Sequence, residues 1–167
     1  MPARAQTETM SHPVTFAVDL GYGFPSSDRF LRGGLIGPSP LAYAYLGAEL
    51  HVDLTTHVAM GLSAGFTAAL GRFAGGSVRL TQPWGADWYR GTAGLGPAYA
   101  SNGSLLAVGD AGLELRSHLG VAVLIGPVIA VALNTAGADR CGVDTCEAYV
   151  PPGSYLVFFR LGLGLNN

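Results

Sequence analysis

Large apolar residues alternate with small or polar residues along most of this chain, and this two-residue period constrains the fold more than any other feature. From Val14 to Phe24 every second residue is large and apolar, and threonine, alanine, aspartate and glycine stand between them. Successive side chains of a strand point to opposite faces, so this pattern predicts a strand with one apolar face. The same period predicts eight strands in all, at 14–24, 44–54, 58–70, 77–82, 87–100, 105–116, 119–133 and 155–165.

The composition narrows the class of protein. The 167 residues, the length of one domain, are 49% hydrophobic and 12% charged, whereas soluble domains carry about 25% charged residues. Disorder is excluded because it needs low hydrophobicity. A net charge of −2 gives no basic surplus for nucleic acid. The apolar run Leu119–Leu133 has 15 residues, fewer than the roughly 20 of a membrane helix, and its valines and isoleucines favour a strand.

The distribution of charge indicates which face meets which medium. The face opposite the charges carries Leu, Val, Ile, Phe and Tyr, which suit lipid, whereas the charged face is mostly Gly and Ala, which suit a narrow barrel interior. The sequence therefore predicts an all-β, eight-stranded antiparallel up-and-down transmembrane β-barrel with its charges inside. Nine charged residues of the predicted strands share the small-residue face: Asp19, Glu49, Asp53, Arg79, Arg90, Asp110, Glu114, Arg116 and Arg160.

Strand lengths and connections agree with this barrel. Seven of the eight predicted strands reach the roughly 9–11 residues that a tilted membrane strand needs. Aromatic residues near the strand ends suit membrane interfaces; they are Tyr22, Phe24, Trp84, Trp88, Tyr89, Tyr99 and Tyr155. With both termini periplasmic, we expect tight turns at 55–57, 83–86 and 117–118 and outer connections at 25–40, 71–76, 101–104 and 134–154.

Over about residues 13–165, this architecture and alternation resemble the small eight-stranded bacterial outer-membrane barrels, such as the OmpA transmembrane domain, OmpX and OmpW. The resemblance implies a bacterial outer-membrane location, with membrane lipid around the barrel. We expect a disordered tail at 1–12 and the barrel domain at 13–167. Ala3-Arg4-Ala5 before Gln6 resembles the end of a cleavage site, which suggests that a signal peptide has been removed; the alternative is a cytoplasmic protein that never had one.

The expected function is structural or based on surface interaction, with loops 25–40 and 134–154 available to other envelope proteins. Burying unpaired charge is prohibitive, so four arginines against five acids suggest an internal salt-bridge network. No cofactor, metal or nucleic-acid partner is expected. The alternatives are a narrow channel for small or hydrophobic solutes and a soluble, calycin-like ligand-binding barrel. The predicted lumen network consists of Asp19, Glu49, His51, Asp53, Arg79, Arg90, Asp110, Glu114, Arg116 and Arg160.

A weaker hypothesis concerns catalysis. Glu49, His51 and Asp53 share one face of a strand, and a turn near Thr56 would put Ser63 opposite Glu49. Carboxylate, imidazole and hydroxyl together are typical of hydrolytic triads. The chain carries no motif that ties this set to an enzyme family, so the expectation is that the protein is not an enzyme and that His51 belongs to the polar lumen.

Three further features remain open at this stage. Cys141 and Cys146 predict a small disulfide-closed loop in an oxidising compartment. Pro97 and Pro127 lie within predicted strands, where proline removes a ladder hydrogen bond. They indicate either a bulge near the outer rim, which we favour, or a lateral gap in the wall. Tyr45 falls on the inner face unless a bulge near Gly47 resets the alternation.

Overall fold

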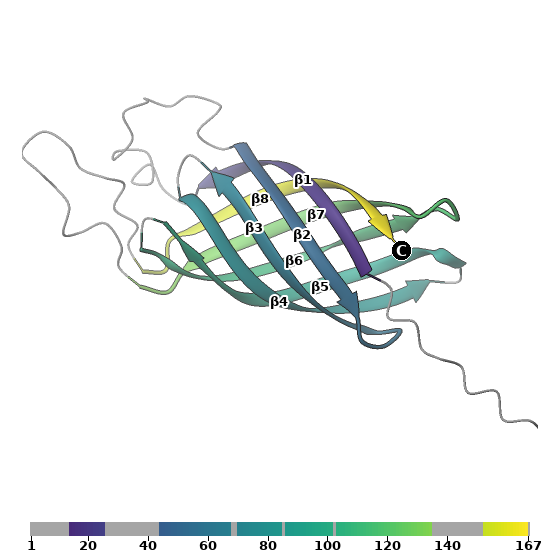
Figure 1. The fold of residues 1–167 in the computed structure, drawn as a ribbon. Helices are drawn as coiled ribbons and strands as arrows, with labels where there is room; N and C mark the ends of the chain where they lie inside the picture. The colour runs from purple at the N-terminus through teal and green to yellow at the C-terminus, as the bar shows by residue number, and fades with distance from the viewer. Residues whose placement is uncertain are drawn as a thin grey trace, which may run out of the picture.

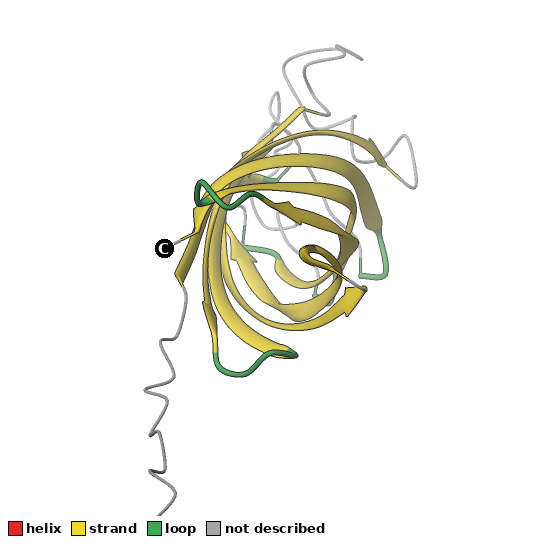
Figure 2. Ribbon diagram, turned by 90° about the vertical axis from the view of Figure 1, so that its right-hand side faces the viewer, coloured by secondary structure: helices red, strands yellow, loops and turns green. Residues whose placement is uncertain are grey.

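The structure, a computed structural model, describes residues 14–25, 44–67, 70–84, 86–101, 103–134 and 152–166. Eight antiparallel strands follow one another around a closed barrel (Figure 1), and the last pairs with the first. The strands curl round into a ring when the barrel is turned (Figure 2). This confirms the predicted all-β, eight-stranded antiparallel barrel. The strands are β1 (Val14–Pro25), β2 (Ala44–Asp53), β3 (Val58–Thr67), β4 (Gly71–Trp84), β5 (Ala86–Ala100), β6 (Leu105–Arg116), β7 (Val121–Ala132) and β8 (Tyr155–Asn166).

Closure depends on the ladder between β1 and β8, which runs from Thr15 opposite Asn166 to Pro25 opposite Leu156. No strand of the described barrel therefore presents an unpaired edge. None of the described residues forms a helix long and apolar enough to cross a membrane.

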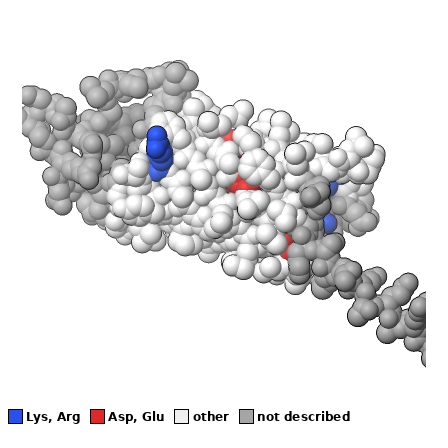
Figure 3. Space-filling view, viewed as in Figure 1, with Lys and Arg blue, Asp and Glu red and all other residues white. Residues whose placement is uncertain are grey.

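The two faces of the sheet follow the alternation in the sequence. Leu20, Leu62 and Leu165 point outward with 60%, 65% and 66% of their surface exposed, whereas Asp19 and Arg160 point inward and are almost fully buried. The outer wall seen in Figure 3 is correspondingly mostly white, and the charged residues show as a few small red patches along it and as blue patches towards its two ends. The barrel is thus apolar outside and carries its charge inside.

The two ends of the barrel differ. At the short-turn end β2 leads to β3, β4 to β5 and β6 to β7, and β1 begins and β8 ends there, whereas at the long-loop end β1 leads to β2, β3 to β4, β5 to β6 and β7 to β8. The first turn is closed by the Leu54 amide, which donates to the Val58 carbonyl at 2.8 Å. Gly120 has a φ of 77° in the turn before β7, a conformation that favours glycine.

Strand β4 corrects the sequence prediction. We expected Ser77–Gln82 with a connection at 71–76, but the strand already begins at Gly71, and the connection is 68–70. Residues 71–76 include three glycines, which have low strand propensity, so the sequence indicated a loop there. A Cβ on Gly75 would collide with the Pro97 carbonyl oxygen, so close strand approach requires glycine there.

The longer strand changes the surroundings of two residues. The sequence predicts Leu70 as the last residue of the third strand, but it lies in the turn before β4 and is buried inside the barrel. Arg72 was assigned to an outer connection, but it lies on β4 with its side chain exposed near the long-loop end.

Neither strand proline forms a bulge. The register is the same on both sides of Pro97, with Gly75 opposite Ala98 and Val78 opposite Leu95, and on both sides of Pro127, although the two residue pairs between are not assigned in either ladder. The predicted bulge is therefore wrong at both positions. Proline only removes a hydrogen bond, and neighbouring glycines let the strands stay close: a Cβ on Gly126 would collide with the Ala111 carbonyl oxygen.

The long-loop half of the interior is filled by an apolar cluster. Tyr45 points inward without any bulge at Gly47, and its ring stacks on Phe73 with centroids 5.8 Å apart and packs against Phe158 at 5.5 Å. The buried members are Tyr45, Leu70, Ala98, Ala100, Leu106, Val128, Ala130, Ala132, Leu156 and Phe158. The lumen is therefore polar in its middle and short-turn half, and apolar towards the long loops.

Two glycines test the close approach of the strands. A Cβ on Gly96 would collide with the Gly76 carbonyl oxygen and lie 2.7 Å from the Ser77 Cα, whereas a Cβ on Gly109 would make ordinary contacts of 3.6 Å or more. We expect Gly96→Ala to lower the free energy of unfolding by about 1–3 kcal/mol. Gly109→Ala should be neutral or stabilising by up to about 1 kcal/mol. Urea unfolding of both variants in detergent checks this, and equal stabilities would contradict it.

Candidate functional site

The interior charge network is the candidate site. All ten residues predicted for it point into the barrel. Asp19 is fully buried, and the side chains of the others are at most 11% exposed except for Arg90 at 21%. The inward positions of six strands supply them, since β3 and β7 contribute none, β1, β4, β5 and β8 contribute one each, and β2 and β6 contribute three each.

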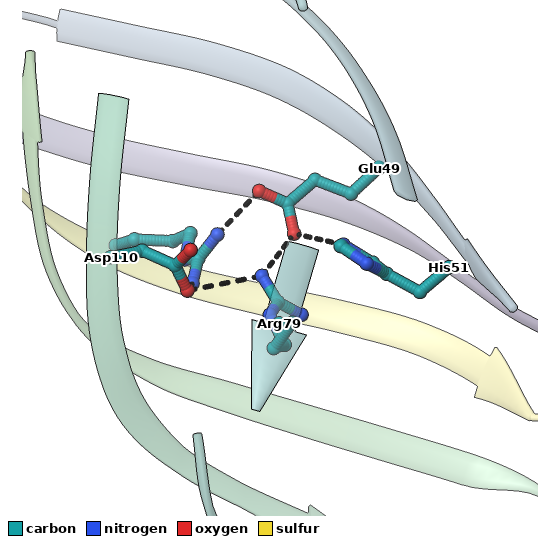
Figure 4. A network of polar contacts seen from close by, with 5 residues as sticks. Glu49, His51, Arg79 and Asp110 are labelled. Atoms are coloured by element: carbon teal, nitrogen blue, oxygen red, sulfur yellow. Dashed lines mark hydrogen bonds and ion pairs between the residues drawn. The ribbon is translucent and has the colours of Figure 1, made fainter. Parts of the chain in front are cut away.

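The central cluster joins two arginines to two carboxylates (Figure 4). One nitrogen of Arg79 donates to Glu49 Oε2 at 3.0 Å and to Asp110 Oδ2 at 3.1 Å. From another part of the wall, Arg160 donates to Asp110 Oδ2 at 2.8 Å and to the second oxygen of Glu49. His51 Nε2 lies 3.0 Å from Glu49 Oε2. Four strands are thereby tied together across the lumen.

A second cluster lies nearer the short-turn end. Arg116 donates to Asp53 Oδ2 from its two terminal nitrogens at 3.3 and 3.4 Å, and its Nε donates to Glu114. Arg90 lies 3.6 Å from the same Asp53 oxygen. Buried carboxylates and guanidinium groups therefore neutralise one another here as in the centre, as a low-dielectric interior requires.

Asp19 was predicted to belong to the network, but no hydrogen bond joins it to the other residues of the network. Both of its carboxylate oxygens are buried and have no hydrogen-bond partner among the described residues. Its side chain faces Gly162 across the β1–β8 ladder. With four arginines against five acids, the interior carries one excess negative charge when His51 is neutral.

Glycines explain how a narrow barrel holds these side chains. Gly94, Gly162 and Gly61 stand directly opposite Asp110, Asp19 and His51 in their ladders. A Cβ on any of the three would collide with the facing carboxylate or imidazole. The small residues on the charged face are thus the spaces into which the larger inner side chains fold, a pairing that only the strand register reveals.

Two small cavities lie on either side of the central cluster. One of about 20 Å³ is lined by His51, Asp53, Arg79 and Glu114, among others. The other, of about 30 Å³, lies between Glu49, Ser63 and the apolar cluster. A water needs about 10–15 Å³ of such space, so each cavity holds few waters, and the ion pairs separate them.

The structure does not assemble the hydrolytic set of Glu49, His51 and Ser63 that the sequence suggests. Ser63 does lie opposite Glu49, as the expected turn predicts. His51, however, uses Nε2 for Glu49, and its buried Nδ1 has no hydrogen-bond partner among the described residues. Ser63 and His51 also line different cavities. The structure therefore does not bring the Ser63 hydroxyl to the His51 imidazole.

Several predictions fall outside the described residues. They are the disulfide between Cys141 and Cys146, the tail at 1–12, and most of the loops 25–40 and 134–154. Among the described residues, no group of three or more His, Cys, Asp or Glu side chains could hold a metal ion.

Comparison with known proteins gives the fold class. No family model matches the chain, and no curated protein matches it in sequence. Among solved structures, it is similar to the N-terminal β-barrel domain of Pseudomonas aeruginosa OprF, with a TM-score of 0.55 and 13% identity over 92% of this chain and 97% of that one. At this identity the likeness concerns the fold alone, which is that of a small eight-stranded β-barrel.

Removing one arginine tests the network. Arg160→Met leaves Arg79 as the one arginine that contacts Glu49 and Asp110 in the central cluster, and breaking a buried ion pair in this way costs about 3–5 kcal/mol. Arg72→Met is the matched control, because Arg72 is exposed on the outer face, and its change should stay within about 0.5 kcal/mol. Denaturant unfolding of both variants measures the difference. Equal losses would show that the interior pairs contribute no specific stability.

Proposed function

We propose that this protein is a bacterial outer-membrane β-barrel that crosses the lipid with a plugged, charge-paired lumen and has a structural or surface-interaction role. The observation that carries this proposal is the outer belt of exposed large apolar side chains around a closed sheet whose charged groups are inside. Soluble monomers rarely expose contiguous apolar patches larger than a few hundred Å². A closed barrel is also the one sheet arrangement that satisfies every backbone group in lipid.

The exposed aromatic residues also support a barrel that crosses the lipid. Trp84 is 50% exposed near the short-turn end, and Tyr99 and Tyr155 are 61% and 44% exposed near the long-loop end. Aromatic side chains in two girdles are typical of both interfaces of a membrane barrel. Bacterial barrels also have even strand numbers and short periplasmic turns, which favours a periplasmic short-turn end and outward loops at 25–40 and 134–154.

The soluble ligand-binding barrel fits these observations poorly. A calycin-like barrel would need bulky apolar residues around a cavity and polar ones outside. Here the interior cavities are about 20 and 30 Å³, against roughly 300–1,000 Å³ for ligand pockets.

An arginine on the outer belt distinguishes lipid from water. Leu20 lies in the middle of β1, is 60% exposed, and pairs with Leu46 and Leu161. In lipid, Leu20→Arg should lower the free energy of unfolding by about 2–4 kcal/mol. On a water-exposed surface the change would stay within about 0.5 kcal/mol. Unfolding from phospholipid vesicles measures it, with Leu20→Met as the control.

Because the proposed lumen is plugged, we expect the protein not to conduct ions. Because ion pairs separate two cavities of about 20 and 30 Å³, the folded protein should give no stable conductance steps in planar bilayers. Regular open steps that vanish on heat unfolding would contradict the plug and favour the narrow-channel alternative.

A further inference from the structure

The outer belt is interrupted over β4, β5 and β6. Outward positions on β5 and β6 are small there, at Gly91, Ala93 and Ala111, whereas Leu80 on β4 stands 59% exposed beside them. The interruption is a groove of about 550 Å³. We call it the β4–β6 groove, and the side chains that define it are Leu80, Gln82, Trp84, Gly91, Ala93 and Ala111.

The groove is built into the fold. Gln82 faces Gly91, Leu80 faces Ala93, and Ala93 faces Ala111 in the ladders, so backbone pairing fixes its floor. The Trp84 ring lies against Gly91, where a Cβ would come within 2.9 Å of it. Rigid strands and a large aromatic wall thus keep the shape of the groove.

The groove also has a polar end and an apolar end. His57 lines it at the short-turn end, held by a 3.2 Å hydrogen bond between its Nδ1 and the Thr81 carbonyl. Gln82 lies beside it, and Leu80, Ala93 and Ala111 follow towards the middle of the barrel. An occupant matched to this gradient has a polar head at the short-turn rim and an apolar chain along the wall.

We propose that the β4–β6 groove is a binding site for one glycerophospholipid, whose head contacts His57 and Gln82 and whose acyl chain lies over Ala93 and Ala111. The proposal rests on the membrane location given above, because it takes the groove to be continuous with the lipid-facing belt. A volume of about 550 Å³ is within the roughly 300–1,000 Å³ of ligand sites. A second copy fits less well, since a symmetric dimer would set this concave patch against itself and leave it unfilled.

Fluorescence of Trp84 provides the test. The chain has two tryptophans, so Trp88→Phe leaves Trp84 as the only one. Phosphatidylethanolamine with a brominated acyl chain is titrated into the protein in detergent micelles, because bromine quenches tryptophan on contact. The expected result is quenching that saturates at one lipid per protein. Linear quenching without saturation would overturn the proposal.

Filling the groove provides the matched comparison. Ala93→Leu with Ala111→Leu should raise the lipid needed for half-quenching about tenfold, the effect of losing roughly two buried methylene groups. Ala64→Leu, on the outer face of β3 away from the groove, should leave it unchanged. Equal titration curves, or a dimer that these substitutions dissociate, would overturn the proposal.

Native mass spectrometry of the unsubstituted protein gives an independent reading, in which one retained phospholipid is expected and none would contradict the site. Both measurements are made on protein that migrates as a folded, heat-modifiable barrel and floats with liposomes. Failure of flotation would contradict the membrane location, whereas failure of saturation alone would contradict only the lipid site.

Discussion

Closure of the sheet through the β1–β8 ladder is the constraint on which the rest of this structure depends. Pairing from Thr15–Asn166 to Pro25–Leu156 removes the edges of the sheet, so backbone polar groups are satisfied without water. Once the sheet is closed, each inward side chain enters a lumen of fixed width. The apolar outer face, the glycines opposite large inner residues and the cross-lumen ion pairs all follow from that geometry.

Two layers of side chains fill the interior of the barrel, one apolar and one charged. Towards the long loops, Tyr45, Phe73 and Phe158 fill the barrel with packed rings. In the middle, guanidinium groups and carboxylates from separate strands fill it with paired charge. Packing restricts water at one level and ion pairs divide the cavities at the next. A structural or interaction role, with the outer face and loops as the working surfaces, is consistent with such an interior.

Much of this could be predicted from the sequence, because alternation fixes which residues face inward once strands are recognised. The facing of Glu49 and Ser63 needed only the position of one turn. The start of β4 was missed because Gly75 and Gly76 have low strand propensity, although close approach to Pro97 requires glycine. Arg160 and Glu49 are 111 residues apart in the sequence, and their contact depends on how the strands are staggered around the barrel. The alternation of apolar and small residues contains no information about this stagger. Predicting the β4–β6 groove from the sequence would have required the register of β4, β5 and β6.

The most direct test of the central claim is to identify the medium at the outer face of β1. After replacement of the two native cysteines, nitroxide labels at Phe16, Val18 and Leu20 would be compared in vesicles for collision with oxygen and with a water-soluble nickel chelate. We expect all three to collide with oxygen and to be shielded from nickel, because these side chains point outward and the proposed membrane location puts acyl chains around them. Free access of the nickel chelate to the label at Leu20, in the middle of the strand, would contradict it.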